Sequence, residues 1–250
     1  MTRLRRQLER FPRLKRLAKA VYSMIQRTPK INYSEITADQ IGALVGRSDP
    51  VILEIGCNDG THTLRFLEIF SNPTIYCFEP DPRAAERFRK NVGARPNVHL
   101  FEMAVSDREG EITFFQSSGH REARDEIGMP KGWDLSGSIR KPTGHIDADP
   151  RITFTRTLTV PTARLDSWCE AHGIDRIDFL WMDVQGGEGD VFKGGQRALA
   201  RTRILYTECC DTEQYEGQLT TKHLLSTLEK FEVLVRYPND VLLRNKHVND

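Results

Sequence analysis

Apolar residues occur along the chain in short blocks that are separated by segments of helical spacing. Five blocks are typical of buried strands, at residues 51–55, 74–78, 97–102, 176–182 and 203–207. Segments with helical spacing or helix-start residues are found at residues 34–45, 61–70, 82–92, 161–172, 188–199 and 220–230. This alternation predicts an α/β domain over residues 34–250, with a doubly wound, mostly parallel sheet covered by helices on both faces.

The remaining segments complete this picture. Residues 111–115 and 152–160 read as strands, and residues 231–236 and 241–244 read as a closing hairpin, which predicts one antiparallel edge strand. Residues 116–150 interrupt the pattern, because they are rich in Gly, Ser, Pro and charge and show no periodicity. An irregular segment of that length is usually functional or disordered, so we expect a substrate-binding insertion there.

The first strand block ends in a glycine turn that suits a nucleoside-bearing ligand. Residues 51–60 read VILEIGCNDG, with Glu54 at the strand end and Gly56 and Gly60 in the turn. The next apolar block closes on Glu79, whose carboxylate can accept hydrogen bonds from both hydroxyls of a ribose. The two strand ends together predict a cofactor site.

The chemistry of the turn narrows the choice of cofactor. A dinucleotide-binding turn carries a further glycine that makes room for a pyrophosphate, whereas here Asp59 lies inside the turn and would repel that anion. Glu54 also favours a cationic ligand. S-adenosylmethionine carries an ammonium and a sulfonium group, so it fits this acidic turn better than a nicotinamide dinucleotide does.

Composition indicates a soluble, cytoplasmic protein. The 250 residues are 38% hydrophobic and 28% charged, and no apolar stretch approaches the ~20 residues that span a bilayer. No signal-peptide core is present. The five cysteines form no C-x-x-C pair, which predicts reduced thiols rather than a zinc site.

The net charge of +1 conceals a basic segment at the start of the chain. Residues 1–30 contain ten Lys and Arg residues against Glu9 alone, which gives this segment +9 and leaves −8 for the rest. Apolar residues recur there at three- and four-residue steps, so residues 1–33 are predicted to form a basic amphipathic helix. Such a helix can lie on an anionic membrane surface, or pack on the domain or on the second copy of a homodimer. Nucleic acid is disfavoured because aromatic residues are sparse there.

Motifs in the second half make the chain resemble the FkbM family of methyltransferases. The stretch LWMDVQGGE at 180–188, followed by VFKGG at 191–195, is similar to the signature of that family. Further matches follow in family order: the glycine turn, FEPD at 78–81, AVSD at 104–107, GS at 137–138 and RLD at 164–166. The resemblance covers about residues 50–245 and departs from the family at Cys57, usually Ala, and at Gln185, usually Glu.

The resemblance implies a class I methyltransferase fold, Rossmann-like with a seven-stranded sheet, and S-adenosylmethionine as cofactor. It also implies roles for individual residues. Glu79 would bind the ribose. The methionine part would be held by Glu54, Gly56, Asn58 and Gly60, and the adenine would be flanked by Ala104, Val105 and Ser106.

Methyl transfer to a sugar hydroxyl calls for a base that removes the hydroxyl proton. Asp183, which ends a central strand, is one candidate; it could instead hold the cofactor ammonium or cap the next helix. Glu208 and the loop residue His145 are further candidates. Asp183 and Glu208 could also hold Mg²⁺, which prefers oxygen ligands. No additional carboxylate pair completes such a site, so we expect no metal.

The implied activity is O-methylation of a hydroxyl on a sugar in a glycan, glycolipid or nucleotide-sugar precursor, in the cytoplasm or peripherally at the inner face of the cell membrane. Trp133 and several basic residues in the insertion suit a charged sugar. Two alternatives remain: an O-methyltransferase for a polyketide or peptide natural product, and a non-catalytic scaffold protein that retains the fold.

Overall fold

The computed structural model describes residues 35–119 and 133–248. The amphipathic helix predicted within residues 1–33 lies outside the described residues, as does the middle of the predicted insertion, residues 120–132. The division of the chain near residue 34 therefore stays a prediction, as does membrane or partner binding by residues 1–30. All statements below concern the described part of the chain.

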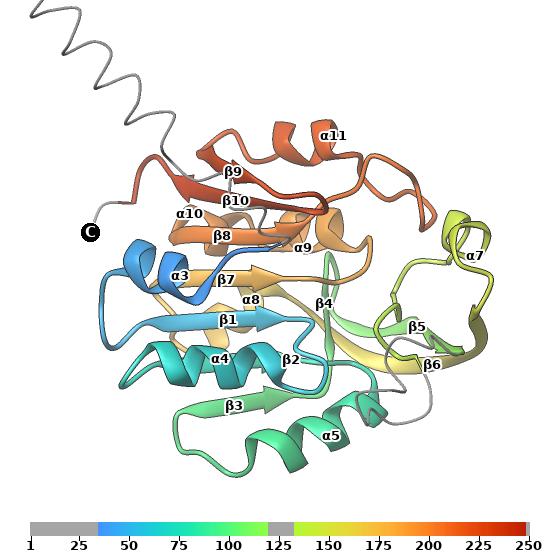
Figure 1. The fold of residues 1–250 in the computed structure, drawn as a ribbon, viewed down its shortest axis with the longest axis horizontal. Helices are drawn as coiled ribbons and strands as arrows, with labels where there is room; N and C mark the ends of the chain where they lie inside the picture. Colours follow the sequence, from blue (N-terminus) through green and yellow to red (C-terminus); the bar gives the residue numbers. More distant parts are fainter. Residues whose placement is uncertain (1–34, 120–132, 249–250) are drawn as a thin grey trace, which may run out of the picture. The chain divides into compact units, whose positions relative to one another are not determined.

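A seven-stranded sheet forms the centre of the domain (Figure 1). Its strands lie in the order β3 (Val98–Phe101), β2 (Thr74–Phe78), β1 (Val51–Ile55), β7 (Ile177–Met182), β8 (Thr202–Glu208), β10 (Asp240–Asn245) and β9 (Phe231–Arg236). The first five strands pair in parallel, and β10 pairs antiparallel with both of its neighbours. The predicted α/β, mostly parallel seven-stranded fold is confirmed.

The predicted position of the antiparallel strand needs one correction. We expected it at the edge of the sheet, but β10 lies one place inside and β9 forms the edge. Burial follows this order, because Val241, Leu242 and Leu243 of β10 are at most 1% exposed whereas β9 has exposed positions such as Val233. Apolar content does not select the inner strand, since β9 (FEVLVR) has more apolar residues than β10 (DVLLRN).

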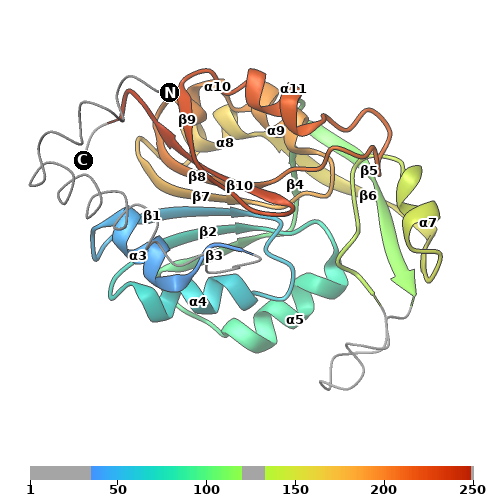
Figure 2. The same ribbon diagram turned by 45° about the horizontal axis from the view of Figure 1, so that its top comes forward.

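Helices cover both faces of the sheet, as expected (Figure 2). One face carries α3 (Ala38–Val45), α4 (Thr61–Ile69) and α5 (Pro82–Val92). The other carries α8 (Leu165–Ala171), α9 (Glu188–Gly194), α10 (Gln196–Ala200) and α11 (Thr221–Ser226). Two predicted helices are corrected: the one at 161–172 begins only at Leu165, and the one at 188–199 is divided at Gly195, whose φ of −126° is not helical.

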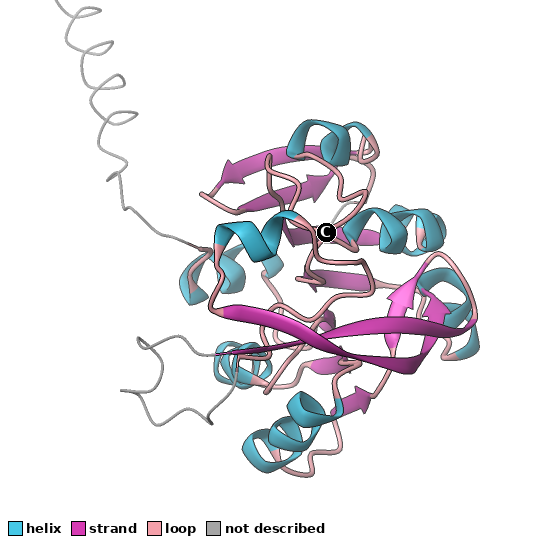
Figure 3. Ribbon diagram, turned by 90° about the vertical axis from the view of Figure 1, so that its right-hand side faces the viewer, coloured by secondary structure: helices cyan, strands magenta, loops and turns pink. Residues whose placement is uncertain are grey.

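A second, three-stranded sheet was not predicted. It consists of β4 (Ala104–Ser106), β6 (Ile152–Arg164) and β5 (Gly110–Gly119), in that order. The short helix α7 (Gly144–Ala148) precedes β6 in the chain. β5 and β6 pair antiparallel from Gly110 opposite Thr162 to Gly119 opposite Ile152. This sheet lies beyond the carboxyl ends of the parallel strands (Figures 1 and 3), so it borders the edge where ligands bind in such folds.

Candidate active site

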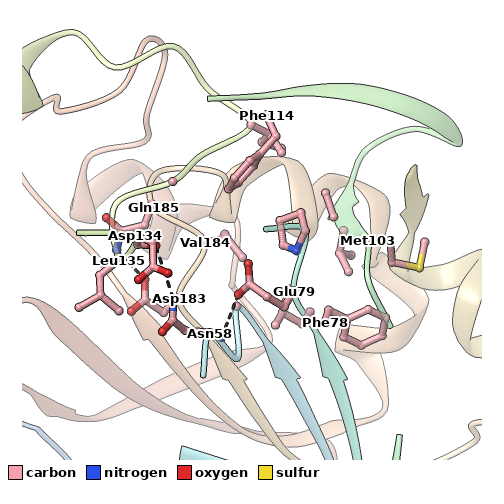
Figure 4. Close-up of a pocket in the computed structure, with 17 residues that line it drawn as sticks. Asn58, Phe78, Glu79, Met103, Phe114, Asp134, Leu135, Asp183, Val184 and Gln185 are labelled. Atoms are coloured by element: carbon pink, nitrogen blue, oxygen red, sulfur yellow. Dashed lines mark hydrogen bonds between the residues drawn. The ribbon is translucent and has the colours of Figure 1, made fainter. Parts of the chain in front are cut away.

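A pocket lies at the carboxyl ends of β1, β2 and β7 (Figure 4). Its walls come from the turns after these three strands, from β4 and β5, and from the loop at residues 134–139. The lining residues are Ile55, Gly56, Asn58, Phe78, Glu79, Pro80, Met103, Ala104, Val105, Phe114, Asp134, Leu135, Gly137, Ile139, Asp183, Val184 and Gln185.

The floor of the pocket depends on a close approach between two strand ends. Gly56 has a φ of +88°, and a Cβ at this position would overlap the carbonyl oxygen of Asp183. The backbone N–H groups of Gly56 and Cys57 both donate to the carbonyl of Phe78. Glycine is therefore required at position 56, both for its left-handed conformation and for the space it leaves.

Glu79 points into the pocket and is held by the backbone (Figure 4). Its Oε2 accepts from the N–H of Asn58 at 2.8 Å and its Oε1 from the N–H of Asp81 at 2.8 Å. Each oxygen keeps a second lone pair that can accept a ribose hydroxyl. Burial raises the pKa of Glu79 to about 8.

Asn58 links the glycine turn to the loop above the pocket. Its φ of 45° is left-handed, and its side-chain amide donates to the carbonyl of Asp134 at 3.4 Å. Arg87 of α5 pairs with the Asp134 carboxylate at 2.5 Å and donates to Oδ1 of Asn58 at 3.3 Å. The guanidinium of Arg87 thus links the loop at Asp134 to the glycine turn at Asn58.

Glu54 lies behind the glycine turn rather than in the pocket wall. It is fully buried, one carboxylate oxygen accepts from the hydroxyl of Thr63, and the other, Oε1, has no hydrogen-bond partner. Burial raises the pKa of Glu54 to about 8. A cationic group in that part of the site would lower this pKa and favour the ionised carboxylate, whose Oε1 has no partner.

The predicted adenine-flanking residues separate into two groups. Ala104 and Val105 line the pocket together with Phe78, Met103 and Phe114, which form an apolar slot suited to a planar ring. Ser106 does not line it: its side chain is fully buried and its hydroxyl lies 2.8 Å from that of Thr162. Gly60, also predicted, is the N-cap of α4 and lies outside the lining.

The three candidate bases also differ in position. Asp183 lines the pocket, and Gln185 connects it to Glu208, because the amide Nε2 donates to Asp183 Oδ1 at 2.7 Å and to Glu208 Oε2 at 3.0 Å. His145 on α7 is buried, and its Nε2 lies 3.0 Å from the hydroxyl of Ser136. The structure does not bring His145 to the pocket wall.

Several lining residues escaped the sequence analysis. Asp134, Leu135 and Ile139 come from the segment without periodicity, where only the GS pair at 137–138 gave a signal. Tyr215, which donates toward Gln185 and the carbonyl of Ser136, had no motif to mark it. Among residues 35–119 and 133–248, no three His, Cys, Asp or Glu side chains converge as metal ligands, and no helix is long and apolar enough to cross a membrane.

The site fits S-adenosylmethionine in three respects: an apolar wall for the adenine, Glu79 for the ribose, and the buried Glu54 behind the turn for the positive charge. Together with the strand order, it defines a class I S-adenosylmethionine-dependent methyltransferase. The sequence matches the model of the methyltransferase FkbM domain over residues 54–233. The chain belongs to the FkbM methyltransferase family.

Its similarity to individual proteins extends over most of the chain. It is 47% identical to the 2-O-methyltransferase NoeI of Sinorhizobium fredii (strain NBRC 101917 / NGR234) over 210 residues, which cover 82% of this chain and 84% of NoeI. It is 26% identical to methyltransferase 1 of Beauveria bassiana, with 76% of each chain covered. Among solved structures, a putative rRNA methylase from Clostridium thermocellum aligns with a TM-score of 0.45 at 9% identity, covering 85% of this chain and 94% of the other.

Proposed function

We propose that the protein transfers a methyl group from S-adenosylmethionine to a hydroxyl of a sugar in a glycan, glycolipid or nucleotide-sugar precursor. The observation that carries the proposal is the carboxylate of Asp183 in the pocket wall, connected through Gln185 to Glu208. The 47% identity to a protein named a 2-O-methyltransferase supports a hydroxyl acceptor.

The proposed roles at the cofactor follow from the contacts. Glu79 accepts the ribose hydroxyls with its remaining lone pairs, and Ala104 and Val105 pack on the adenine with Phe78 and Phe114. Gly56, Asn58 and Gly60 shape the turn that holds the methionine part. Glu54 favours the positive charge of that part from behind the turn. Ser106 supports the adenine wall from behind through its bond to Thr162.

The chemistry proposed for the chain's own residues is removal of one proton. Bound S-adenosylmethionine supplies an electrophilic methyl group, whose bond to sulfur breaks with the electron pair remaining on sulfur. Asp183 accepts the proton of the acceptor hydroxyl as the oxygen attacks, and Glu208 lies within reach of the same amide bridge. His145 acts at a distance, by holding Ser136 between the lining residues Leu135 and Gly137. No metal is needed for this step, because positioning supplies much of the rate.

Isotopic methyl transfer to a panel of acceptors tests the activity. We expect product with sugar glycosides, nucleotide sugars or lipid-linked glycans, and a large loss with Asp183→Asn while binding of S-adenosylhomocysteine remains. Turnover confined to polyketide or peptide scaffolds would show that the acceptor is a natural product of that kind and not a sugar. Cofactor binding without turnover on any hydroxyl acceptor would leave a non-catalytic protein.

The proposal includes a peripheral position on the inner face of the cell membrane. Its support is the basic amphipathic pattern of residues 1–30, which suits an anionic surface. The full chain should sediment with anionic vesicles at low salt, and a chain lacking residues 1–27 should not. Equal sedimentation of both would remove the membrane part of the proposal. Light scattering of the same two proteins tests whether this segment forms a homodimer instead.

A further inference from the structure

The turn after β7 is built so that the side chain of Gln185 has one fixed direction. Gln185 has a φ of 53°, a left-handed conformation that costs a residue with a side chain about 1 kcal/mol or more. Its carbonyl accepts from the hydroxyl of Ser138 at 2.7 Å. The next residue, Gly186, has a φ of +88°, and a Cβ there would lie 2.9 Å from the ring of Tyr215. The strained turn is therefore held from two sides.

The carboxamide of Gln185 matches its three neighbours in donors and acceptors. Its NH₂ group has two hydrogens and faces two carboxylates, Asp183 at 2.7 Å and Glu208 at 3.0 Å. Its oxygen faces the hydroxyl of Tyr215 at 3.0 Å. The single hydroxyl hydrogen of Tyr215 also has the carbonyl of Ser136 within reach at 2.9 Å. Both acids can accept from this NH₂ group only in the amide orientation that also presents the oxygen to Tyr215.

The two acids also act on each other directly, both by charge and by a side-chain hydrogen bond between Glu208 and Asp183. Burial and the neighbouring Asp183 raise the pKa of Glu208 well above its usual range. The other titratable groups that act on this pair are Glu188 on α9, Asp240 on β10, Tyr215 and His62 on α4. Most of these groups are acids, and they keep the pKa of Glu208 above its usual range.

We propose that Gln185 is a positioning residue that makes Asp183 and Glu208 one proton-accepting pair, and that Tyr215 fixes the orientation of its amide. The inference rests on the proposed function, in which Asp183 takes the acceptor proton. That proton adds to two carboxyl groups that both accept a hydrogen bond from the same amide. Gln185 itself takes no proton.

The test compares the pH profiles of kcat for the wild type, Gln185→Glu and Gln185→Met. Gln185→Glu adds a third acid, and Gln185→Met keeps the length but removes both donors. We expect both to move the acid limb of the profile upward, by about one pH unit for Gln185→Glu, because a nearby like charge disfavours the ionised form. We expect kcat at pH 7 to fall about 100-fold in Gln185→Met and less in Gln185→Glu, which is the family's usual residue, while KM for the cofactor changes little in both. The matched control is Gln196→Glu, the same change at an exposed position of α10, which should leave the profile unchanged.

A lower kcat with an unmoved acid limb would overturn the inference, since it would show a structural effect alone. If thermal unfolding shows that the Gln185 variants do not fold, Tyr215→Phe serves instead. It should move the limb in the same direction by a smaller amount, and an unmoved limb there would also overturn the inference.

A second readout separates this inference from the proposed function. Carbon-13 carboxyl NMR of acceptor-free protein follows the titration of Glu208 without any turnover. If the wild type methylates no hydroxyl acceptor, the proposed function fails. In that case a Glu208 titration that moves in Gln185→Met would still support the role of the Gln185 amide between the two acids. A Glu208 titration that does not move would overturn it. If the wild type methylates a hydroxyl while the Glu208 titration and the pH profile are the same in all variants, the inference alone fails.

Discussion

The close approach at Gly56 gives the sharpest prediction about the cofactor site. Replacing Gly56 with Ala has two separate costs, because φ is +88° and because the new Cβ would overlap the carbonyl oxygen of Asp183 and lie 2.9 Å from its carbonyl carbon. Both atoms belong to the backbone, so no side chain can rotate to relieve the overlap. The ends of β1 and β7, which flank the pocket, must move apart.

Gly173 separates the two costs. It also has a positive φ, +64°, but a Cβ there would meet nothing within 4 Å. Gly173→Ala should therefore lose only the conformational cost of a left-handed residue, about 1–2 kcal/mol. Gly56→Ala should lose the same amount and about 1–3 kcal/mol more for overpacking. In a domain of this size each kcal/mol lowers Tm by about 2–4 °C.

Thermal unfolding and calorimetric titration with S-adenosylhomocysteine measure both effects. We expect Gly173→Ala to bind as the wild type does. Gly56→Ala should melt several degrees below Gly173→Ala and bind at least tenfold more weakly, which corresponds to about 1.4 kcal/mol. If the two variants melt together and bind equally, the approach of Asp183 does not shape the site and the reasoning fails.

Three further predictions concern charge. Arg87→Ala should weaken S-adenosylhomocysteine binding several-fold, because Asp134 and Asn58 lose their shared cation, whereas Arg89→Ala, whose partner Glu102 is exposed, should not. Burial raises the pKa of Glu54 from 4.5 to about 8, so the folded state holds a proton that the unfolded chain releases, and the free energy of unfolding falls as the pH rises from about 4.5 to 8. Glu54→Gln should remove part of that fall. Urea unfolding at pH 5 and pH 8 measures it, and a variant that loses as much stability between the two pH values as the wild type would contradict the prediction. Methyl transfer should continue at its full rate in excess EDTA; a loss restored by Mg²⁺ would contradict metal independence.

The inner parallel strands of the central sheet were predictable because most of their residues are buried. β1, β2, β7 and β8 are short apolar runs, and each closes on or next to an acid, so pattern and chemistry coincide there. Glu79 and Gly56 could be placed at the pocket for the same reason, since both lie at a strand end. A short apolar run marks a buried strand clearly in a sequence, so residues at the end of such a run can be located in the fold.

The start of α8 could not be predicted, because Pro161 suits two structures. Proline is favoured in the first turn of a helix, which placed the predicted helix at residue 161. In the structure β6 continues to Arg164, and Pro161 pairs only with β5, since β4 joins β6 from Thr162 onward. A proline is tolerated where a strand has a neighbour on one side only. The long β5–β6 pairing therefore overrides a local helix signal.

The pairings around the acids join distant parts of the chain. Gln185 meets Glu208 across 23 residues and Tyr215 across 30, and Asn58 meets Asp134 across 76. In the sequence, Gln185 differs from the family's usual Glu only in lacking a negative charge. In the structure its amide donates to two carboxylates. A Glu at this position has no donor when ionised and one when protonated, so it can donate to at most one of the two. On the inference above, the identity of residue 185 therefore sets the pH range in which the pair can accept a proton.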